Sequence, residues 1–138
     1  MPNEPPRGVT KDQYEVLAAF RRELRAFLRF SEQAAARVGL TPQQHQLLLA
    51  IKGYPGREWA TISELSDVMA LRHHSVVGIV DRSCRAGIVQ RRPHANDHRY
   101  IEVVLTATGE ARLEALTKSH VDELRRLWPT LAPIERLH

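Results

Sequence analysis

Apolar residues recur at helical spacing over residues 11–38, with arginines placed between them. The members of this stripe are Tyr14, Leu17, Phe20, Leu24, Phe27 and Leu28. A stripe on one face, with charge on the other, predicts a long amphipathic helix that packs against further apolar surface. Gly39 follows directly and predicts the end of this helix.

Two capping boxes predict the starts of further helices. TPQQ (residues 41–44) has threonine as cap, proline at the first helical position and glutamine as the reciprocal partner. This second helix should stop near Gly53, because GYPG is turn chemistry. TISE (residues 61–64) predicts a short helix over residues 62–69, and the side chains expected to be buried there are Ile62, Leu65, Val68 and Met69.

After a break at residues 70–72, HHSVVGIVDRSCRAG predicts another helix that ends at Gly87. Its inner side chains are expected to be Val76, Ile79 and Val80. The β-branched stretch SVVGIV also fits a strand, but a strand would leave Asp81 and Arg82 without a role, so we prefer the helix. Two short helices joined by a turn of this length form a helix-turn-helix.

The last third of the chain predicts two strands and a long helix. IVQRR and RYIEVVL form the strands, joined by PHAND, and side chains of the second should alternate between its two faces. The expected faces are Ile101, Val103 and Leu105 on one side, and Tyr100, Glu102 and Val104 on the other. The final helix starts after Thr106, carries a leucine stripe from Leu113 to Leu127 and should end at Pro129, before the start of another helix.

This order of elements predicts a mainly α fold with a small β-hairpin wing (α+β), a winged helix-turn-helix between terminal helices. The 138 residues are enough for one domain, which we place at residues 11–138 after a flexible, Pro-rich lead-in at residues 1–10. The lead-in lacks the apolar core of a secretory signal, and no stretch approaches the length of a membrane span. A single cysteine, Cys84, fits a reducing compartment, so we expect the protein in the cytoplasm.

Positive charge is concentrated in one segment of the chain. Between Arg72 and Arg99 there are six arginines and two acids, which accounts for the whole net charge of +4. Such a concentration is typical of a protein that binds a polyanion, although a solvated basic face remains an alternative. Asp97 stands two residues before Arg99 at the tip of the predicted hairpin, where its carboxylate can fix the turn and the guanidinium.

The sequence resembles the MarR (multiple antibiotic resistance regulator) family of transcription factors over about residues 11–135. The resemblance is clearest in DHRYIEVVLT, which matches a D-x-R-x5-L-T wing signature at Asp97, Arg99, Leu105 and Thr106. TISELSDVMAL is similar to the family's first helix-turn-helix segment, and SVVGIVDRSCRAGIVQR to its recognition helix and wing. Ser83 departs from the family pattern, which usually has leucine there.

The resemblance implies a homodimer that binds a pseudo-palindromic operator in double-stranded DNA, with recognition helices in the major groove and wings in the minor groove. Residues 41–106 would then bind DNA, and the terminal helices at 11–38 and 107–138 would form a dimerisation platform. The expected DNA-binding residues are Arg72, His73, His74, Ser75, Val77, Gly78, Arg82, Arg91, Arg92, His98 and Arg99, with Asp97 supporting the wing. Val77 and Gly78 replace residues that are often polar in the family. The expected dimerisation residues are Leu17, Phe20, Leu113, Leu116 and Leu124.

We expect a repressor that a small molecule or an oxidant releases, and other interpretations stay open beside it. One is a winged-helix module that binds protein without binding DNA, although it would not need the wing arginines. Another is a metal-responsive regulator, since His94 and His98 have H-x3-H spacing, but no third ligand lies nearby and we expect no metal site. Cys84 between two arginines is a redox candidate or a structural thiol.

The remaining sequence features give no sign of catalysis or of a cofactor. The aromatics of the first helix, Tyr14, Phe20, Phe27 and Phe30, are candidates to line an effector cavity, but a helix core is the simpler explanation. The chain lacks paired carboxylates, a nucleophile-base arrangement and a phosphate-binding glycine loop. We therefore expect neither an enzyme nor a bound cofactor.

Overall fold

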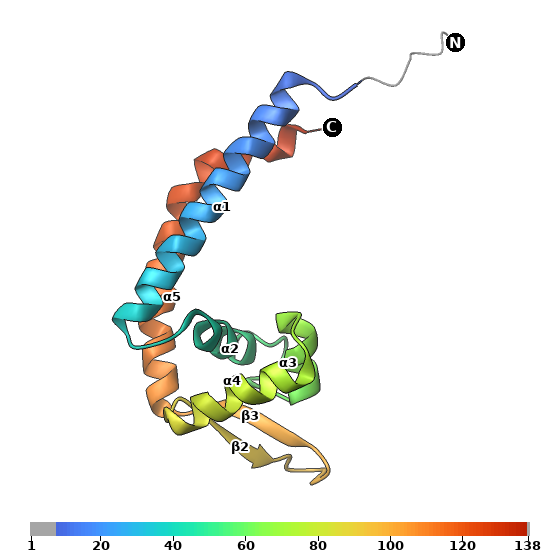
Figure 1. Cartoon of the computed structure of the whole chain (residues 1–138), viewed down its shortest axis with the longest axis vertical. Helices are drawn as coiled ribbons and strands as arrows, with labels where there is room; N and C mark the ends of the chain where they lie inside the picture. Colours follow the sequence, from blue (N-terminus) through green and yellow to red (C-terminus); the bar gives the residue numbers. More distant parts are fainter. Residues whose placement is uncertain (1–7, 138) are drawn as a thin grey trace, which may run out of the picture.

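The computed structural model of the protein describes residues 8–137, so most of the expected lead-in lies outside the described residues. Figure 1 shows a winged lobe below two long helices that lie side by side. The helices are α1 (Lys11–Arg37), α2 (Pro42–Lys52), α3 (Ile62–Met69), α4 (His73–Arg85) and α5 (Ala107–Leu131), with a final 3-10 helix η1 (Ala132–Arg136). The strands are β1 (Trp59–Ala60), β2 (Val89–Pro93) and β3 (Ile101–Leu105). We call α2 to β3 the winged lobe, and α1 with α5 the helical pair.

Side-chain caps explain where the helices start. Thr10, Thr41 and Thr61 each accept a hydrogen bond from the backbone N–H three residues on, and the side chain at that third position returns one. Capping boxes of this kind satisfy amides that a helix start leaves unpaired. The two boxes expected in TPQQ and TISE are confirmed, and a third opens α1.

The sheet has one strand more than the hairpin expected from the sequence. Its order is β1-β3-β2, all antiparallel, with Trp59 opposite Val104 and Val89 opposite Leu105. Because β3 is the central strand, its middle is covered on both sides, and Glu102, Val103 and Val104 are all buried. Side chains on both faces of this strand are therefore buried at its middle, and the strand starts at Ile101 rather than Arg99.

The main core lies where α2, α3 and α4 pack on the sheet. Its fully buried side chains include Leu47, Ile51, Leu65, Val76 and Val80. The inner face expected for α4 is confirmed, and so is Leu65 on α3. Val68 was expected to be buried but is exposed, because it lies on the outer side of α3.

The far end of α5 also differs from expectation. Pro129 lies inside the helix, which continues to Leu131 before turning into η1. A proline this close to a helix end removes one of the last backbone hydrogen bonds and leaves the others in place. Across residues 8–137, none of the helices combines the length and the apolar character that crossing a membrane demands.

Candidate nucleic-acid interface

Helix α4 presents one apolar and one polar side. Val76, Ile79, Val80 and Ser83 are buried in the lobe, and the Ser83 hydroxyl has no hydrogen-bond partner among the residues that the structure describes. The exposed side begins at the cap residue Arg72 and carries His73, His74 and Arg82. The cations and imidazoles on the exposed side of this helix can donate hydrogen bonds to acceptor atoms of DNA phosphates and base edges.

Three expected contact residues of α4 are less accessible than their neighbours. Val77 and Gly78 are half-buried, as is Ser75 at the helix start. A Cβ added at Gly78 would lie 3.2 Å from Nη1 of Arg82, so the guanidinium folds back over this glycine. The arginine therefore occupies space that a polar side chain at position 78 would otherwise fill.

The turn before α4 is held in one shape by local bonds. Ala70 adopts the left-handed conformation with a φ of 53°, and the N–H of Leu71 donates to the Ser66 carbonyl at 3.1 Å. This is the geometry that ends a helix sharply, usually with glycine at the left-handed position. This turn fixes the orientation of α4 relative to α3.

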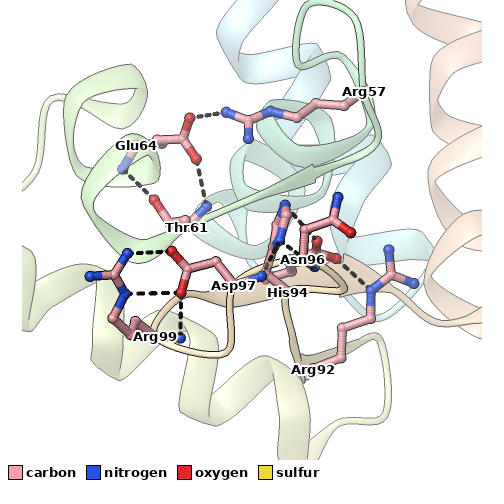
Figure 2. Close-up of polar contacts among 9 residues, drawn as sticks. Arg57, Thr61, Glu64, Arg92, His94, Asn96, Asp97 and Arg99 are labelled. Carbon is pink, nitrogen blue, oxygen red and sulfur yellow. Dashed lines mark hydrogen bonds and ion pairs between the residues drawn. The ribbon is translucent and has the colours of Figure 1, made fainter.

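The wing turn holds Arg99 by its neighbour Asp97, as Figure 2 shows. One carboxylate oxygen accepts from the backbone N–H of Arg99 at 3.1 Å and from its Nε at 3.0 Å, and the other accepts from Nη2 at 2.8 Å. These bonds from the Arg99 side chain, then its backbone, lower the pKa of Asp97. The Arg99 side chain is still 85% exposed, so the tip presents an oriented cation to solvent.

The other two wing arginines are held by carboxylates of the lobe. Arg91 donates to Asp81 of α4 at 2.6 Å and lies 3.7 Å from the sulfur of Cys84. Arg92 donates from Nε to Glu102 at 2.6 Å, and the carboxylate of Glu102 is nearly fully buried. Within residues 8–137, by contrast, no carboxylate lies within ion-pair distance of Arg72 or Arg82. The basic segment thus contains both neutralised and open cations.

A cluster of aromatic and charged side chains supports the wing from behind, and no expectation from the sequence covered it. The guanidinium of Arg57 stacks on Tyr54 and Trp59 and donates to Glu64, which also accepts from the Tyr54 hydroxyl. Figure 2 shows Arg57 and Glu64 above the wing turn. A cavity of about 380 Å³ lies between this cluster and the turn. The signal that could have located it is Trp59, an aromatic two residues before the TISE cap.

The structure separates the residues of the H-x3-H spacing. His94 is half-buried and faces the wing turn and Trp59, whereas His98 is exposed. In the described part of the chain, no group of three or more histidine, cysteine, aspartate or glutamate side chains is placed to hold a metal ion.

The helical pair leaves large apolar side chains exposed. They are Tyr14, Leu17, Leu24, Leu28, Val121, Leu124 and Trp128. Phe20, another expected dimerisation residue, is half-buried. Leu113 and Leu116 are buried within the chain as part of the main core, so they have no surface left for a partner. That part of the expected interface is corrected.

A histidine pair lies where the helical pair meets the lobe. His120 of α5 donates or accepts at Ser31 of α1 over 2.8 Å, and its ring lies 4.9 Å from that of His45 on α2. Burial, and then the charge of His120, lower the pKa of His45. Phe27 and Phe30 pack edge-on against His120. Phe27 and Phe30 thus serve this junction, whereas Tyr14 is exposed and Phe20 has no ring contact with His120.

Comparison with known proteins finds a family model and several solved structures that are similar to this chain. A model described as the MarR family matches residues 38–99, which include the helix-turn-helix and the wing turn. The HTH-type transcriptional repressor YetL of Bacillus subtilis (strain 168) is 34% identical over 62 residues, 45% of this chain and 37% of that protein. The matching segment thus spans little more than a third of that relative.

The likeness extends beyond the lobe in solved structures. The MarR family transcription regulator SP03579 has a TM-score of 0.72 and 25% identity, over 90% of this chain and 80% of that one. The helix-turn-helix and wing segment, and the fold around it, are therefore similar to those of MarR-family regulators. An S. aureus MepR F27L mutant, solved bound to an oligodeoxyribonucleotide, shares the fold with a TM-score of 0.66 at 20% identity, over 95% of this chain and 86% of that one.

In this chain, the D-x-R-x5-L-T signature has a structural explanation at each position. Asp97 and Arg99 form the wing tip, and Leu105 closes β3 against the core. Thr106 caps α5 by accepting from the N–H of Gly109, and its hydroxyl donates to the carbonyl of Gly87 at 2.6 Å. The signature therefore joins the wing to the helix-turn-helix and to α5.

Proposed function

We propose that this protein is a transcriptional repressor that binds a pseudo-palindromic operator in double-stranded DNA as a homodimer. The observation that carries the proposal is the pairing of two cationic elements on one lobe, the exposed side of α4 and the oriented tip cation Arg99. A recognition helix in the major groove with an arginine in the flanking minor groove is the docking that such a pair permits. The nucleotide-bound MepR relative supports the choice of DNA as partner.

Within this proposal the contact residues divide into two groups. Arg72, His73, His74 and Arg82 would meet the DNA from α4, joined by His98 and Arg99 from the wing. Arg91 and Arg92 are proposed to reach phosphates only in competition with Asp81 and Glu102, so their contribution should be smaller. Ser75, Val77 and Gly78 would pack close to the groove rather than read it.

The homodimer is supported by the exposed apolar side chains of the helical pair. One lobe reads only a few base pairs, and a second copy related by a two-fold axis doubles the site. Leu17 and Leu124, which are 57% and 50% exposed, are the proposed contacts. Such a surface is unfavourable in water unless a partner covers it.

The repressor role rests on the name of the YetL relative, and release by a small molecule or an oxidant completes the proposal. Cys84 is the oxidant candidate, since it is half-buried at the end of α4 and next to Arg91. A cytoplasmic location follows from the same role.

The decisive experiment is selection of bound sequences from random DNA, followed by titration of the selected operator at increasing salt. If a dimer neutralises about six to ten phosphates, affinity should fall roughly 10³- to 10⁵-fold between about 50 and 200 mM salt. Arg82→Ala should reduce the slope, by about one for each phosphate that is no longer neutralised. Lys118→Ala, which removes an exposed charge from the helical pair, is the matched control and should leave the slope unchanged.

Two outcomes would favour the competing functions. Operator binding that barely responds to salt, or no selected sequence at all, would favour a module that binds protein. Selection that succeeds only with added zinc would favour a metal-responsive regulator.

A further inference from the structure

The wing turn is closed around the ring of a histidine. Nδ1 of His94 accepts hydrogen bonds from the backbone N–H groups of Asn96 at 3.1 Å and Asp97 at 3.2 Å, as Figure 2 shows. The backbone N–H of His94 donates to the carbonyl of Tyr100 at 3.0 Å, which closes the turn from the other side. The imidazole thus takes the place that an aspartate or asparagine side chain fills in an Asx turn.

These bonds define the protonation state of the ring. A nitrogen that accepts from two amides carries a lone pair, so the single ring proton belongs on Nε2. That nitrogen faces Oε1 of Glu102 at 3.7 Å, and the ring packs edge-on against Trp59 with centroids 5.0 Å apart. The ring therefore connects β1 and β3 to the turn.

We propose that neutral His94 is a positioning residue for DNA binding. The proposal rests on the function proposed above. His94 holds the amide of Asp97, and the carboxylate of Asp97 holds Arg99 by its backbone and its guanidinium. The chain of contacts ends at the tip cation, so the imidazole sets where Arg99 enters the minor groove without touching DNA itself.

Two substitutions separate the acceptor from the ring. In asparagine the acceptor Oδ1 is bonded to Cγ, as Nδ1 is in histidine, so His94→Asn keeps an acceptor within reach of both amides. His94→Phe keeps an aromatic ring against Trp59 and has no acceptor. A third variant, His94→Gln, keeps an acceptor but places it one bond further out, beyond the amides.

Titration of the selected operator gives the first test. His94→Asn should bind within about twofold of the parent, and His94→Phe should lose roughly tenfold, because two hydrogen bonds of ordinary net strength are removed. His94→Gln should resemble the phenylalanine variant. The loss should be greatest on operators with A·T-rich flanks, where the narrow groove attracts arginine. Equal affinity of all three variants, or a phenylalanine variant that binds better than the asparagine variant, would overturn the proposal.

Nitrogen NMR of the folded protein gives a second test that needs no DNA. We expect the ring of His94 to show an unprotonated Nδ1, and the amides of Asn96 and Asp97 to exchange slowly with solvent. A protonated Nδ1 at neutral pH would overturn the proposal even if the protein binds DNA. A parent that binds no DNA but shows the expected ring would instead refute the proposed function and leave the turn geometry standing.

Acidification sharpens the NMR test. When the ring signals report the imidazolium form, Nδ1 can no longer accept, so both amides should exchange faster in step with it. Charged groups near the ring could also change the amide exchange rates on acidification. They are Glu102, Arg92, Asp97, Arg99, Arg57 and Glu64. His94→Asn is therefore the control, because these groups remain and the ring is gone. The same response in that variant would assign the effect to the carboxylates and overturn the role of His94.

Discussion

In the winged lobe the apolar side chains are buried by the chain itself, whereas along most of the helical pair they remain exposed. Leu47, Leu65 and Val80 have no exposed surface, but Leu17 and Trp128 are each 57% exposed. One region can close its core within a single chain, and the other needs further surface to cover it. Under the proposed function, the lobe would carry recognition and the helical pair would carry assembly.

The boundary between the two regions runs through α5. Leu113 and Leu116, near its start, belong to the lobe core, whereas Val121 and Leu124 further along are exposed. One helix therefore contributes to both regions. Substitutions on successive turns of α5 should then have different consequences.

The largest effect is expected from Leu116→Glu. Its side chain is 2% exposed, and replacing it removes a packed leucine and buries a carboxylate without a partner. We expect a loss of about 3–5 kcal/mol or more, enough to unfold much of the protein. Thermal unfolding followed by circular dichroism measures it.

Leu124→Glu is the matched control for that change. It should leave the methyl NMR signals of the lobe unchanged while light scattering shows a smaller particle. Equal unfolding of both variants would remove the boundary drawn through α5, and a stable dimer of Leu124→Glu would refute the proposed interface.

A smaller loss should follow Gly109→Ala, in the first turn of α5. A Cβ there would lie 2.0 Å from the carbonyl oxygen of Ile88, so backbone must move. We expect a cost of about 1–3 kcal/mol, measured by urea unfolding. Gly78→Ala is the control, since its Cβ would meet only the flexible end of Arg82, and helix propensity should favour it by about 0.5–1 kcal/mol. Similar midpoints for the two variants would contradict the close approach at Gly109.

Arg99→Ala should leave folding and assembly unchanged and weaken DNA binding alone. The expected loss is about 1–3 kcal/mol, largest on operators with A·T-rich flanks, because a minor-groove arginine responds to width and potential. The measurement is a titration against operators that differ only in their flanks. If the variant binds all of them as the parent does, the wing is only a structural hairpin.

Asp97→Ala should act in the same direction and more weakly, because it loosens the tip cation without removing it. The Arg99 side chain lowers the pKa of Asp97 below its usual 3.8, so the contact is complete at neutral pH and disappears only as the pH falls through that lowered value. Binding at pH 6 and pH 8 should therefore show no contribution from the titration of this carboxyl. A loss larger than that of Arg99→Ala would mean that Asp97 has another role.

Local sequence signals predicted most of the fold. Capping boxes and helical periodicity placed α1 to α4, because helix starts depend on residues within one turn. β1 was missed because a two-residue strand has no periodicity, and its pairing with β3 joins Trp59 to Val104 across the chain. The burial of Glu102 also depends on residues distant in sequence, since its partners are Arg92 of β2 and His94.

The candidate site was predicted by residue type but not by pairing. Asp97 and Arg99 are close in sequence, so their contact was foreseeable. The bonds of Arg91 to Asp81 and of Arg92 to Glu102 depend on how α4 and β3 approach β2. Leu113 and Leu116 look like the rest of their stripe, and only the packed lobe distinguishes them from Leu124.

Thr106 joins the two regions without a linker. Its N–H donates to the Ile88 carbonyl at 3.0 Å and its hydroxyl donates to the Gly87 carbonyl, so the start of α5 is bonded directly to the lobe. At 25 residues, α5 is about 37 Å long. A tilt of α5 by about five degrees about its first residue would displace its far end by about 3 Å. In the proposed two-fold assembly, the angle of α5 would therefore set the separation of the two α4 helices, and with it the spacing of the half-sites that the protein could bind.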